Sequence, residues 1–309
     1  MATMTDAELL SGVYGAPPAQ LAAVPKGARQ LSPLYPSASA LGAANPGSYS
    51  SIAMLAPSGT LERRYAMAAA LNALAPHAVL TVLAPKDKGG ARLAKELAVF
   101  GCAVDETSKS HHRICVVRRP ETLIGLEEAL REGAPRFVDS IGLWSQPGIF
   151  SWDRVDPGSL LLCERLPQLQ GNGADLGCGV GYLSRHVLQS QDVTRIDLVD
   201  IDRRAIDAAR RNVTDGRAHL HWADASGGAP KLSNLDFVVM NPPFHNAGTE
   251  DKGLGQAFIR RAAQILRPGG VCWLVANRHL PYEAALNAAF KSVRLDHEGD
   301  GFKIYEAKA

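Results

Sequence analysis

The sequence predicts an α/β protein with parallel sheets, arranged as two domains in a chain of 309 residues. Short apolar runs typical of buried strands alternate with longer segments of helical composition, which is the pattern of a parallel sheet covered by helices. Glycines follow one of these strands and consecutive prolines follow another, so both strands end abruptly. The chain is long enough for two domains with cores of ordinary size.

Composition places the chain among ordinary soluble globular proteins. Apolar residues make up 46% and charged residues 21%, and the net charge of +2 does not by itself argue for nucleic acid. The five cysteines have no C-x-x-C spacing, which argues against a disulfide framework and a zinc ribbon. Asp6 and Glu8 stand near the start, and no apolar run has membrane length. We therefore expect a cytoplasmic protein with no signal peptide and no membrane partner.

The first 135 residues divide into two parts. Residues 1–50 are rich in Ala, Pro, Ser and Gly and are expected to form an irregular arm. Residues 51–135 are expected to form a small α/β domain without a glycine-rich turn that could approach a ligand. Basic residues in its loops either face a phosphate or, more simply, form a solvated surface: Arg63, Arg64, Lys86, Lys88, Arg92, Lys109 and Arg113.

Residues 136–309 are expected to form the larger α/β domain. A segment rich in Gly, Pro and aromatic residues, 133–159, connects the two domains and is expected to fold as a lid over the second. Helices are predicted at residues 159–166, 182–188, 204–213, 256–266 and 282–290. Strands are predicted at residues 173–176, 195–201, 219–224, 235–240, 271–276 and 302–308.

A glycine-rich turn follows the first of these strands. Asp175 precedes Gly177, Cys178 and Gly179, and these glycines let the backbone turn tightly and approach a ligand closely. Asp200 closes the next strand at the offset expected for a carboxylate that binds ribose hydroxyls. Two more residues complete the predicted nucleoside site at the end of the third strand: Asp224, a candidate acceptor for an adenine amino group, and its neighbour Ala225.

Asn241-Pro242-Pro243-Phe244 follows the fourth strand. Two prolines lack backbone N–H groups and fix φ, so the strand must end in a rigid turn. Open α/β sheets bind ligands at this end of their strands. An amide, a carbonyl and an aromatic ring at such a turn suit a flat substrate that carries an amine.

Together these features resemble the class I S-adenosylmethionine-dependent methyltransferases, from about residue 150 to the C-terminus. The resemblance implies a Rossmann-like seven-stranded methyltransferase sheet preceded by a smaller, degenerate α/β domain. It also implies S-adenosyl-L-methionine as the cofactor. The residues implied to bind it are Asp175, Gly177, Cys178, Gly179, Asp200, Asp224 and Ala225.

A closer resemblance is to the RsmC and RlmG group of ribosomal RNA guanine-N2 methyltransferases. It is carried by residues 146–151, 156–159, 241–245 and 275–282. It implies ribosomal RNA or a ribosomal subunit as the partner and a degenerate first domain that helps to hold RNA. The implied catalytic residues are Asn241 and Pro242 as acceptors for the guanine amine, Pro243 as part of the rigid turn, and Phe244 as a stacking platform.

Other functions stay open at this point. The same chemistry on RNA adenine N6 or on a protein glutamine uses a similar turn, and a catalytically silent RNA-binding protein is a third possibility. A nicotinamide oxidoreductase is disfavoured because it gives the Asn-Pro-Pro-Phe turn no role. His219 and His221 share a strand face but have no third ligand at metal spacing, so no metal site is expected.

Overall fold

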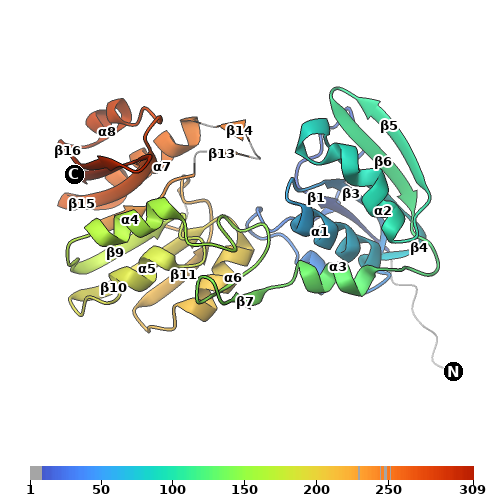
Figure 1. Ribbon diagram of the computed structural model, residues 1–309, viewed down its shortest axis with the longest axis horizontal. Helices are drawn as coiled ribbons and strands as arrows, with labels where there is room; N and C mark the ends of the chain where they lie inside the picture. Colours follow the sequence, from blue (N-terminus) through green and yellow to red (C-terminus); the bar gives the residue numbers. More distant parts are fainter. Residues whose placement is uncertain (1–8, 229, 244, 247–248, 251) are drawn as a thin grey trace. The chain divides into compact units, whose positions relative to one another are not determined.

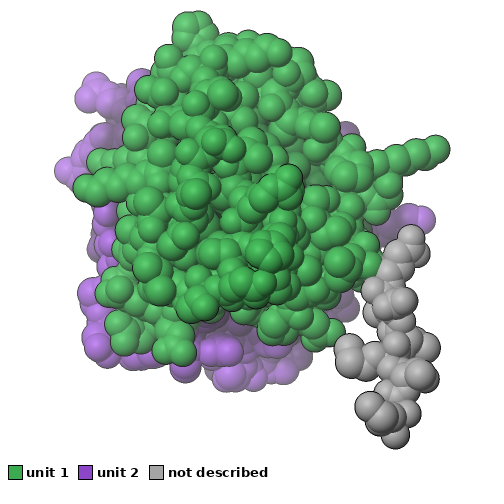
Figure 2. Space-filling view, turned by 90° about the vertical axis from the view of Figure 1, so that its right-hand side faces the viewer, with its two compact units in different colours: residues 1–134 green, residues 135–309 purple. Residues whose placement is uncertain are grey.

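The computed structural model describes residues 9–228, 230–243, 245–246, 249–250 and 252–309. The chain folds into two compact units, residues 1–134 and 135–309, drawn as ribbons in Figure 1 and in separate colours in Figure 2. Each unit has its own sheet and its own hydrophobic core. None of the described helices is long and apolar enough to cross a membrane.

The first unit contains a six-stranded mixed sheet in the order β2-β1-β3-β4-β6-β5. Strands β1 to β4 are parallel, and β6 and β5 are added antiparallel at one edge. The strands are β1 (Leu10–Tyr14), β2 (Arg29–Gln30), β3 (Tyr49–Leu55), β4 (Leu74–Pro85), β5 (Val104–Lys109) and β6 (His112–Arg118). The helices are α1 (Thr60–Ala73), α2 (Leu93–Val99) and α3 (Leu126–Glu132).

The segment expected to be an irregular arm contributes two strands to this sheet. Strand β1 lies between β2 and β3, and Tyr14 and Leu31 are buried in the core of the unit. Gly12 allows this packing, because a Cβ at that position would lie 2.6 Å from Cδ1 of Leu31. For the described residues between 9 and 50, the structure thus corrects the expectation of an arm, since their apolar side chains are needed to complete the core.

One basic residue of the first unit is not on a solvated surface. The side chain of Arg63 is fully buried, and its Nε and Nη2 donate to the two carboxylate oxygens of Glu96, both at 2.7 Å. Its Nη1 donates to the carbonyl of Ser58 at 2.7 Å, in the turn between β3 and α1. The buried guanidinium therefore connects Glu96 of α2 to the turn between β3 and α1.

The second unit contains the seven-stranded sheet that the family resemblance implies, in the order β11-β10-β9-β12-β15-β17-β16. Only β17 runs antiparallel to the parallel strands, and β16 pairs with it as a hairpin. The Rossmann-like fold class is confirmed. Its strands are β9 (Gly171–Leu176), β10 (Val193–Asp200), β11 (Ala218–Trp222), β12 (Leu235–Met240), β15 (Leu266–Asn277), β16 (Ser292–Gly299) and β17 (Phe302–Lys308).

Helices cover both faces of this sheet (Figure 1). Along β12, Phe237 and Val239 enter one core and Val238 and Met240 the other, because side chains alternate along a strand. The first core also contains residues of α4 (Pro157–Arg165), α5 (Tyr182–Val187) and α6 (Arg203–Asn212). The second contains residues of α7 (Lys252–Ile265) and α8 (Glu283–Ala289). Two short hairpins complete the unit: β7 (Arg136–Val138) with β8 (Leu143–Ser145), and β13 (His245–Asn246) with β14 (Thr249–Glu250).

The order of the strands places the site. From β9 the chain adds β10 and β11 on one side, and it then returns to add β12 on the other side. The carboxyl ends of β9 and β12 therefore flank the point where the strand order reverses, which is where open α/β sheets form a ligand crevice. The glycine-rich turn follows β9 and the Asn-Pro-Pro corner follows β12.

Candidate cofactor and amine-binding site

The glycine-rich turn between β9 and α5 has a backbone that only glycine adopts easily. Gly177, Gly179 and Gly181 have φ values of +75°, +54° and +87°. A Cβ at Gly181 would lie 2.7 Å from Cγ2 of Val213, so this glycine permits close packing against the end of α6. A Cβ at Gly179 would meet nothing within 4 Å. The turn therefore has open space beside Gly179, in which a ligand can approach the backbone.

Asp175 lies beneath this turn, at the end of β9, and is fully buried. Its Oδ2 accepts a hydrogen bond of 2.7 Å from the hydroxyl of Ser184. Its Oδ1 is buried and has no hydrogen-bond partner among the described residues. Burial raises the pKa of Asp175 to about 7, against the lowering effect of the Ser184 hydrogen bond, and the negative charge of Asp200 adds to the rise. An unpaired carboxylate oxygen in this position fits a ligand that carries an ammonium group.

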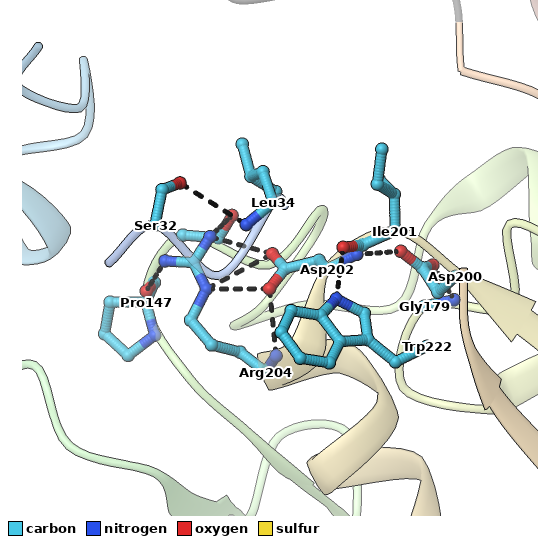
Figure 3. A network of polar contacts seen from close by, with 10 residues as sticks. Ser32, Leu34, Pro147, Gly179, Asp200, Ile201, Asp202, Arg204 and Trp222 are labelled. Atoms are coloured by element: carbon cyan, nitrogen blue, oxygen red, sulfur yellow. Dashed lines mark hydrogen bonds and ion pairs between the residues drawn. The ribbon is translucent and has the colours of Figure 1, made fainter. Parts of the chain in front are cut away.

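Asp200 ends β10 and faces the glycine-rich turn (Figure 3). Its Oδ2 accepts from the backbone N–H of Gly179 and its Oδ1 from that of Asp202, both at 2.8 Å. Burial raises the pKa of Asp200 to about 6, although these backbone hydrogen bonds oppose the rise. Asp202 caps α6 and pairs with Arg204 at 2.7 Å. Asp202 is held by an ion pair and a helix cap, whereas Asp200 forms no ion pair with a described residue and accepts backbone hydrogen bonds beside the glycine-rich turn, so Asp200 is the better candidate for ribose hydroxyls.

The remaining predicted cofactor residues differ in exposure. Asp224 is exposed, and its Oδ1 accepts from the backbone N–H and the hydroxyl of Ser226 at 2.8 and 2.6 Å. Ala225 is buried in the core that α7 and α8 share with the sheet. Cys178 is also buried, and burial raises its thiol pKa well above the ordinary value. Such a thiol is a packing group and not a nucleophile.

The Asn-Pro-Pro corner lies beside the glycine-rich turn. Asn241 is half-buried and Pro242 is buried, and a Cβ at Gly177 would lie 3.9 Å from Cδ of Pro243. The amide nitrogen of Asn241 donates to Oδ2 of Asp156 at 2.8 Å and to the hydroxyl of Ser159 at 3.0 Å. Phe244 lies outside the described residues.

A single pocket joins these elements within the second unit. The residues 177–180 of the glycine-rich turn line it together with Asn241, Asp156 and Ser159. The Gly- and Pro-rich segment expected to form a lid supplies further walls, between Ile141 and Asp156. The pocket therefore has the Asn241 amide and the glycine-rich turn among its walls.

Several residues that line or support this pocket were not predicted from the sequence. Asn212 at the end of α6 donates from its amide nitrogen to the carbonyls of Trp144 and Val180, both at 2.9 Å, and its Oδ1 accepts from the Trp144 N–H at 2.8 Å. It thus ties the segment around β8 to the glycine-rich turn. Asp156 and Ser159 lie in residues 156–159, which contribute to the family resemblance but had no predicted role in the site. Asp-Pro at a helix start is nevertheless a recognisable N-terminal capping signal.

One of the two histidines of β11 is paired with an aspartate of the neighbouring strand. Nε2 of His221 bonds to Oδ1 of Asp197 at 2.6 Å, and Asp197 also accepts two hydrogen bonds from Arg195. Burial would raise the pKa of Asp197, but these hydrogen bonds hold it at about 2. Across the described ranges, no three His, Cys, Asp or Glu side chains gather as metal ligands.

Known proteins match this chain in sequence. Residues 140–306 match the model of the methyltransferase small domain. Ribosomal RNA small subunit methyltransferase C of Hahella chejuensis is 35% identical over 177 residues, which cover 57% of this chain and 52% of that protein. The protein of the same name from Pseudomonas aeruginosa is 34% identical over 250 residues, which cover 78% of this chain and 74% of the relative. The aligned part is thus about half of the first relative and about three quarters of the second.

A solved structure matches over both units. It is described as the T. thermophilus 16S rRNA N2 G1207 methyltransferase (RsmC) in complex with AdoMet and guanosine. The match has a TM-score of 0.73 at 26% identity and covers 87% of this chain and 75% of that chain. The family model spans more than half of the chain, and the Pseudomonas relative is covered over most of its length. The chain therefore belongs to the methyltransferase small domain family, in the group of proteins called ribosomal RNA small subunit methyltransferase C.

Proposed function

We propose that this protein transfers a methyl group from S-adenosylmethionine to the exocyclic N2 amine of a guanine in ribosomal RNA. The observation that carries the proposal is the orientation of the Asn241 amide. Both of its N–H groups are taken up by Asp156 and Ser159, so only its oxygen is left to bind a substrate, and an oxygen binds an amine. This acceptor stands at the end of β12, beside the glycine-rich turn.

The residues around that turn fit the cofactor. The orphaned Oδ1 of Asp175 suits the ammonium of its methionyl part, and the open space at Gly179 suits the backbone approach. Asp200 is proposed to bind the ribose hydroxyls and Asp224 the adenine amino group, with Gly177, Cys178 and Ala225 forming the walls. When bound, the cofactor supplies an activated methyl group on its sulfonium, so the protein needs mainly to orient the acceptor.

The acceptor amine is proposed to be held by two oxygens. Oδ1 of Asn241 and the carbonyl of Pro242 each accept one N–H, which directs the nitrogen lone pair toward the methyl group. Both oxygens also stabilise the positive charge that develops on this nitrogen. Pro243 keeps the turn rigid, and Phe244, outside the described residues, is proposed to stack on the base after it leaves its helix or loop.

The names of the relatives support ribosomal RNA as the substrate. The Hahella and Pseudomonas proteins are named for the ribosomal RNA of the small subunit, and the T. thermophilus structure for 16S rRNA N2 G1207 and guanosine. We propose the small ribosomal subunit or its RNA as the partner of this chain, and the cytoplasm, where ribosomes are assembled, as its location.

The test is methylation of ribosomal subunits from a strain that lacks this gene. The protein and labelled S-adenosylmethionine should label one guanine of small-subunit RNA at N2. Asn241→Ala should lower kcat by roughly 10²-fold or more with cofactor affinity unchanged. Asn172→Ala is a matched control, since Asn172 stands at the start of β9 and bonds Thr194 at 2.8 Å. Label on adenine, on protein or on no component would contradict the proposal.

A further inference from the structure

We propose that Asp156, assisted by Ser159, is a positioning residue that fixes which end of the Asn241 amide faces the substrate. The inference rests on the proposed function, in which the amide oxygen accepts the target amine. An asparagine side chain presents an acceptor at one end and two donors at the other. A rotation of half a turn about its last bond would offer N–H groups to an amine that needs an acceptor.

The contacts of Asp156 permit one orientation only. Its Oδ2 lies 2.8 Å from the Asn241 amide nitrogen and 2.8 Å from the backbone nitrogen of Ser159. This oxygen accepts a hydrogen bond from the Ser159 N–H, so it is an acceptor, and the group that faces it must be the NH₂ end of the amide. The rotated amide would place its oxygen against this carboxylate, losing a hydrogen bond and adding a repulsion.

The helix start holds Asp156 in place. Asp156 is the N-cap of α4, with Pro157 at the first helical position, and its bond to the Ser159 N–H is the capping bond. Aspartate is a preferred N-cap residue, and the capping bond fixes the carboxylate rotamer independently of the Asn241 amide. One carboxylate oxygen therefore serves both the helix and the amide.

Ser159 takes the second amide hydrogen. Its hydroxyl lies 3.0 Å from the Asn241 amide nitrogen, and the residue is buried, with 9% of its surface exposed. No described residue donates a hydrogen bond to Oδ1 of Asn241, which is left to the pocket. The charge-assisted bond that the amide donates to Asp156 also polarises the amide, which increases the negative charge on that oxygen and strengthens it as an acceptor.

Substitutions at residue 156 separate positioning from helix capping. Asp156→Ser keeps a capping oxygen for α4, but its shorter side chain does not reach the amide. We expect kcat for RNA methylation to fall by roughly 10²-fold, with the KM for RNA, the cofactor affinity and the unfolding midpoint close to those of the wild type. Asp156→Asn keeps an oxygen toward both donors and should recover most of the lost kcat. Equal losses in the two variants, or full activity in Asp156→Ser, would overturn the inference.

A second readout does not depend on activity. The side-chain NH₂ resonances of Asn241, assigned by their loss in Asn241→Ser, report the two bonds directly in the cofactor-bound protein. Asp156→Ser should shift both proton resonances toward those of a free amide, and Ser159→Ala should shift chiefly one. Ser190→Ala, which removes a 2.7 Å bond to the Leu169 carbonyl in the loops that precede β9 and β10, should leave them in place. Unshifted resonances in Asp156→Ser would overturn the inference.

The two outcomes are separable. If the wild-type protein labels no guanine of ribosomal RNA, the proposed function fails, while the Asn241 resonances still decide whether Asp156 orients the amide. If labelling succeeds and Asp156→Ser changes neither kcat nor the resonances, the proposed function stands and the positioning role fails.

Discussion

The hydroxyl of Ser184 donates a hydrogen bond of 2.7 Å to one oxygen of Asp175, while the other oxygen of this fully buried carboxylate has no partner among the described residues. One oxygen of the carboxylate is therefore satisfied within the fold, and the other is buried without a partner among the described residues. A buried charge without a full set of partners costs stability, and a cationic ligand recovers that cost on binding. Residues that bind a ligand often lower the stability of the ligand-free protein.

The first prediction is that Asp175→Asn stabilises the cofactor-free protein at pH 8 and weakens the cofactor complex. The folded-state pKa of Asp175 is about 7, above its value near 3.9 in the unfolded chain. The folded state thus binds more protons between these pH values, and stability falls as the pH rises from about 4 through 7. The asparagine removes this loss, a gain of about 1–3 kcal/mol at pH 8, measured by urea unfolding.

At pH 4 the two proteins should have similar stability, since the aspartate is then protonated in the fold. Calorimetry should show at least tenfold weaker binding of S-adenosylmethionine to the variant, about 1.4 kcal/mol. A variant that is less stable than the wild type at pH 8, or that binds the cofactor normally, would remove Asp175 from the proposed site.

The second prediction is that cofactor affinity rises with pH. Asp200 has a pKa of about 6 and Asp175 of about 7 in the cofactor-free fold, and a cationic ligand binds better when both are ionised. The dissociation constant should fall about tenfold between pH 5.5 and 8. Calorimetry in two buffers of different ionisation enthalpy should detect proton release on binding near pH 6.5. A flat affinity over this range would contradict the assignment.

The third prediction is that a side chain at Gly179 weakens cofactor binding by filling the space beside the turn, in addition to straining the backbone. Gly179→Ala introduces a Cβ at φ +54° into the open space that the cofactor is proposed to fill. Gly301→Ala in the turn between β16 and β17 is the matched control, since it also has positive φ, +83°, and nothing within 4 Å of an added Cβ. Both variants should lose about 1 kcal/mol of stability, and only Gly179→Ala should weaken cofactor binding. Equal affinity in the two variants would mean that the space beside Gly179 is not used.

The sequence predicts the second unit well because its signals are local. The glycine-rich turn and the two prolines after β12 end their strands wherever those strands lie, since each acts through its own backbone. Among the strands that the sequence did not predict, β5 and β16 stand at the edges of their sheets. None of their residues is buried and most are polar, so they show no apolar run. Strand β1 was missed because the prolines around it dominate the composition of its segment.

The contacts that orient side chains could not be predicted, because they join residues far apart in the chain. Asp156 meets Asn241 across 85 positions and Asn212 meets Trp144 across 68. Arg63 was interpreted as a surface cation, yet Glu96, 33 residues later, holds it in the interior. The residue type at these positions indicates which hydrogen bonds and ion pairs the side chain can form. Only the packing of the strands and helices determines its partner.

The last prediction concerns Asn212, which uses its whole amide to hold the pocket together. It accepts from the Trp144 N–H at 2.8 Å and donates to the carbonyls of Trp144 and Val180 at 2.9 Å. Asn212→Ala leaves these three partly buried backbone groups without their partner, and we expect a loss of about 2 kcal/mol in unfolding free energy.

Asn212→Asp separates the two donated bonds from the accepted one. The aspartate still accepts from the Trp144 N–H, but its second oxygen faces two carbonyl oxygens, so the glycine-rich turn at Val180 should loosen at neutral pH. Hydrogen exchange should therefore accelerate around residues 177–181 in both variants, and cofactor affinity should fall in both. Asn212 is not among the residues that line the pocket. A loss of cofactor affinity in these variants would therefore come from a change in the position of the glycine-rich turn. If exchange at the turn is unchanged while the protein is destabilised, Asn212 supports only the β8 segment and not the cofactor site.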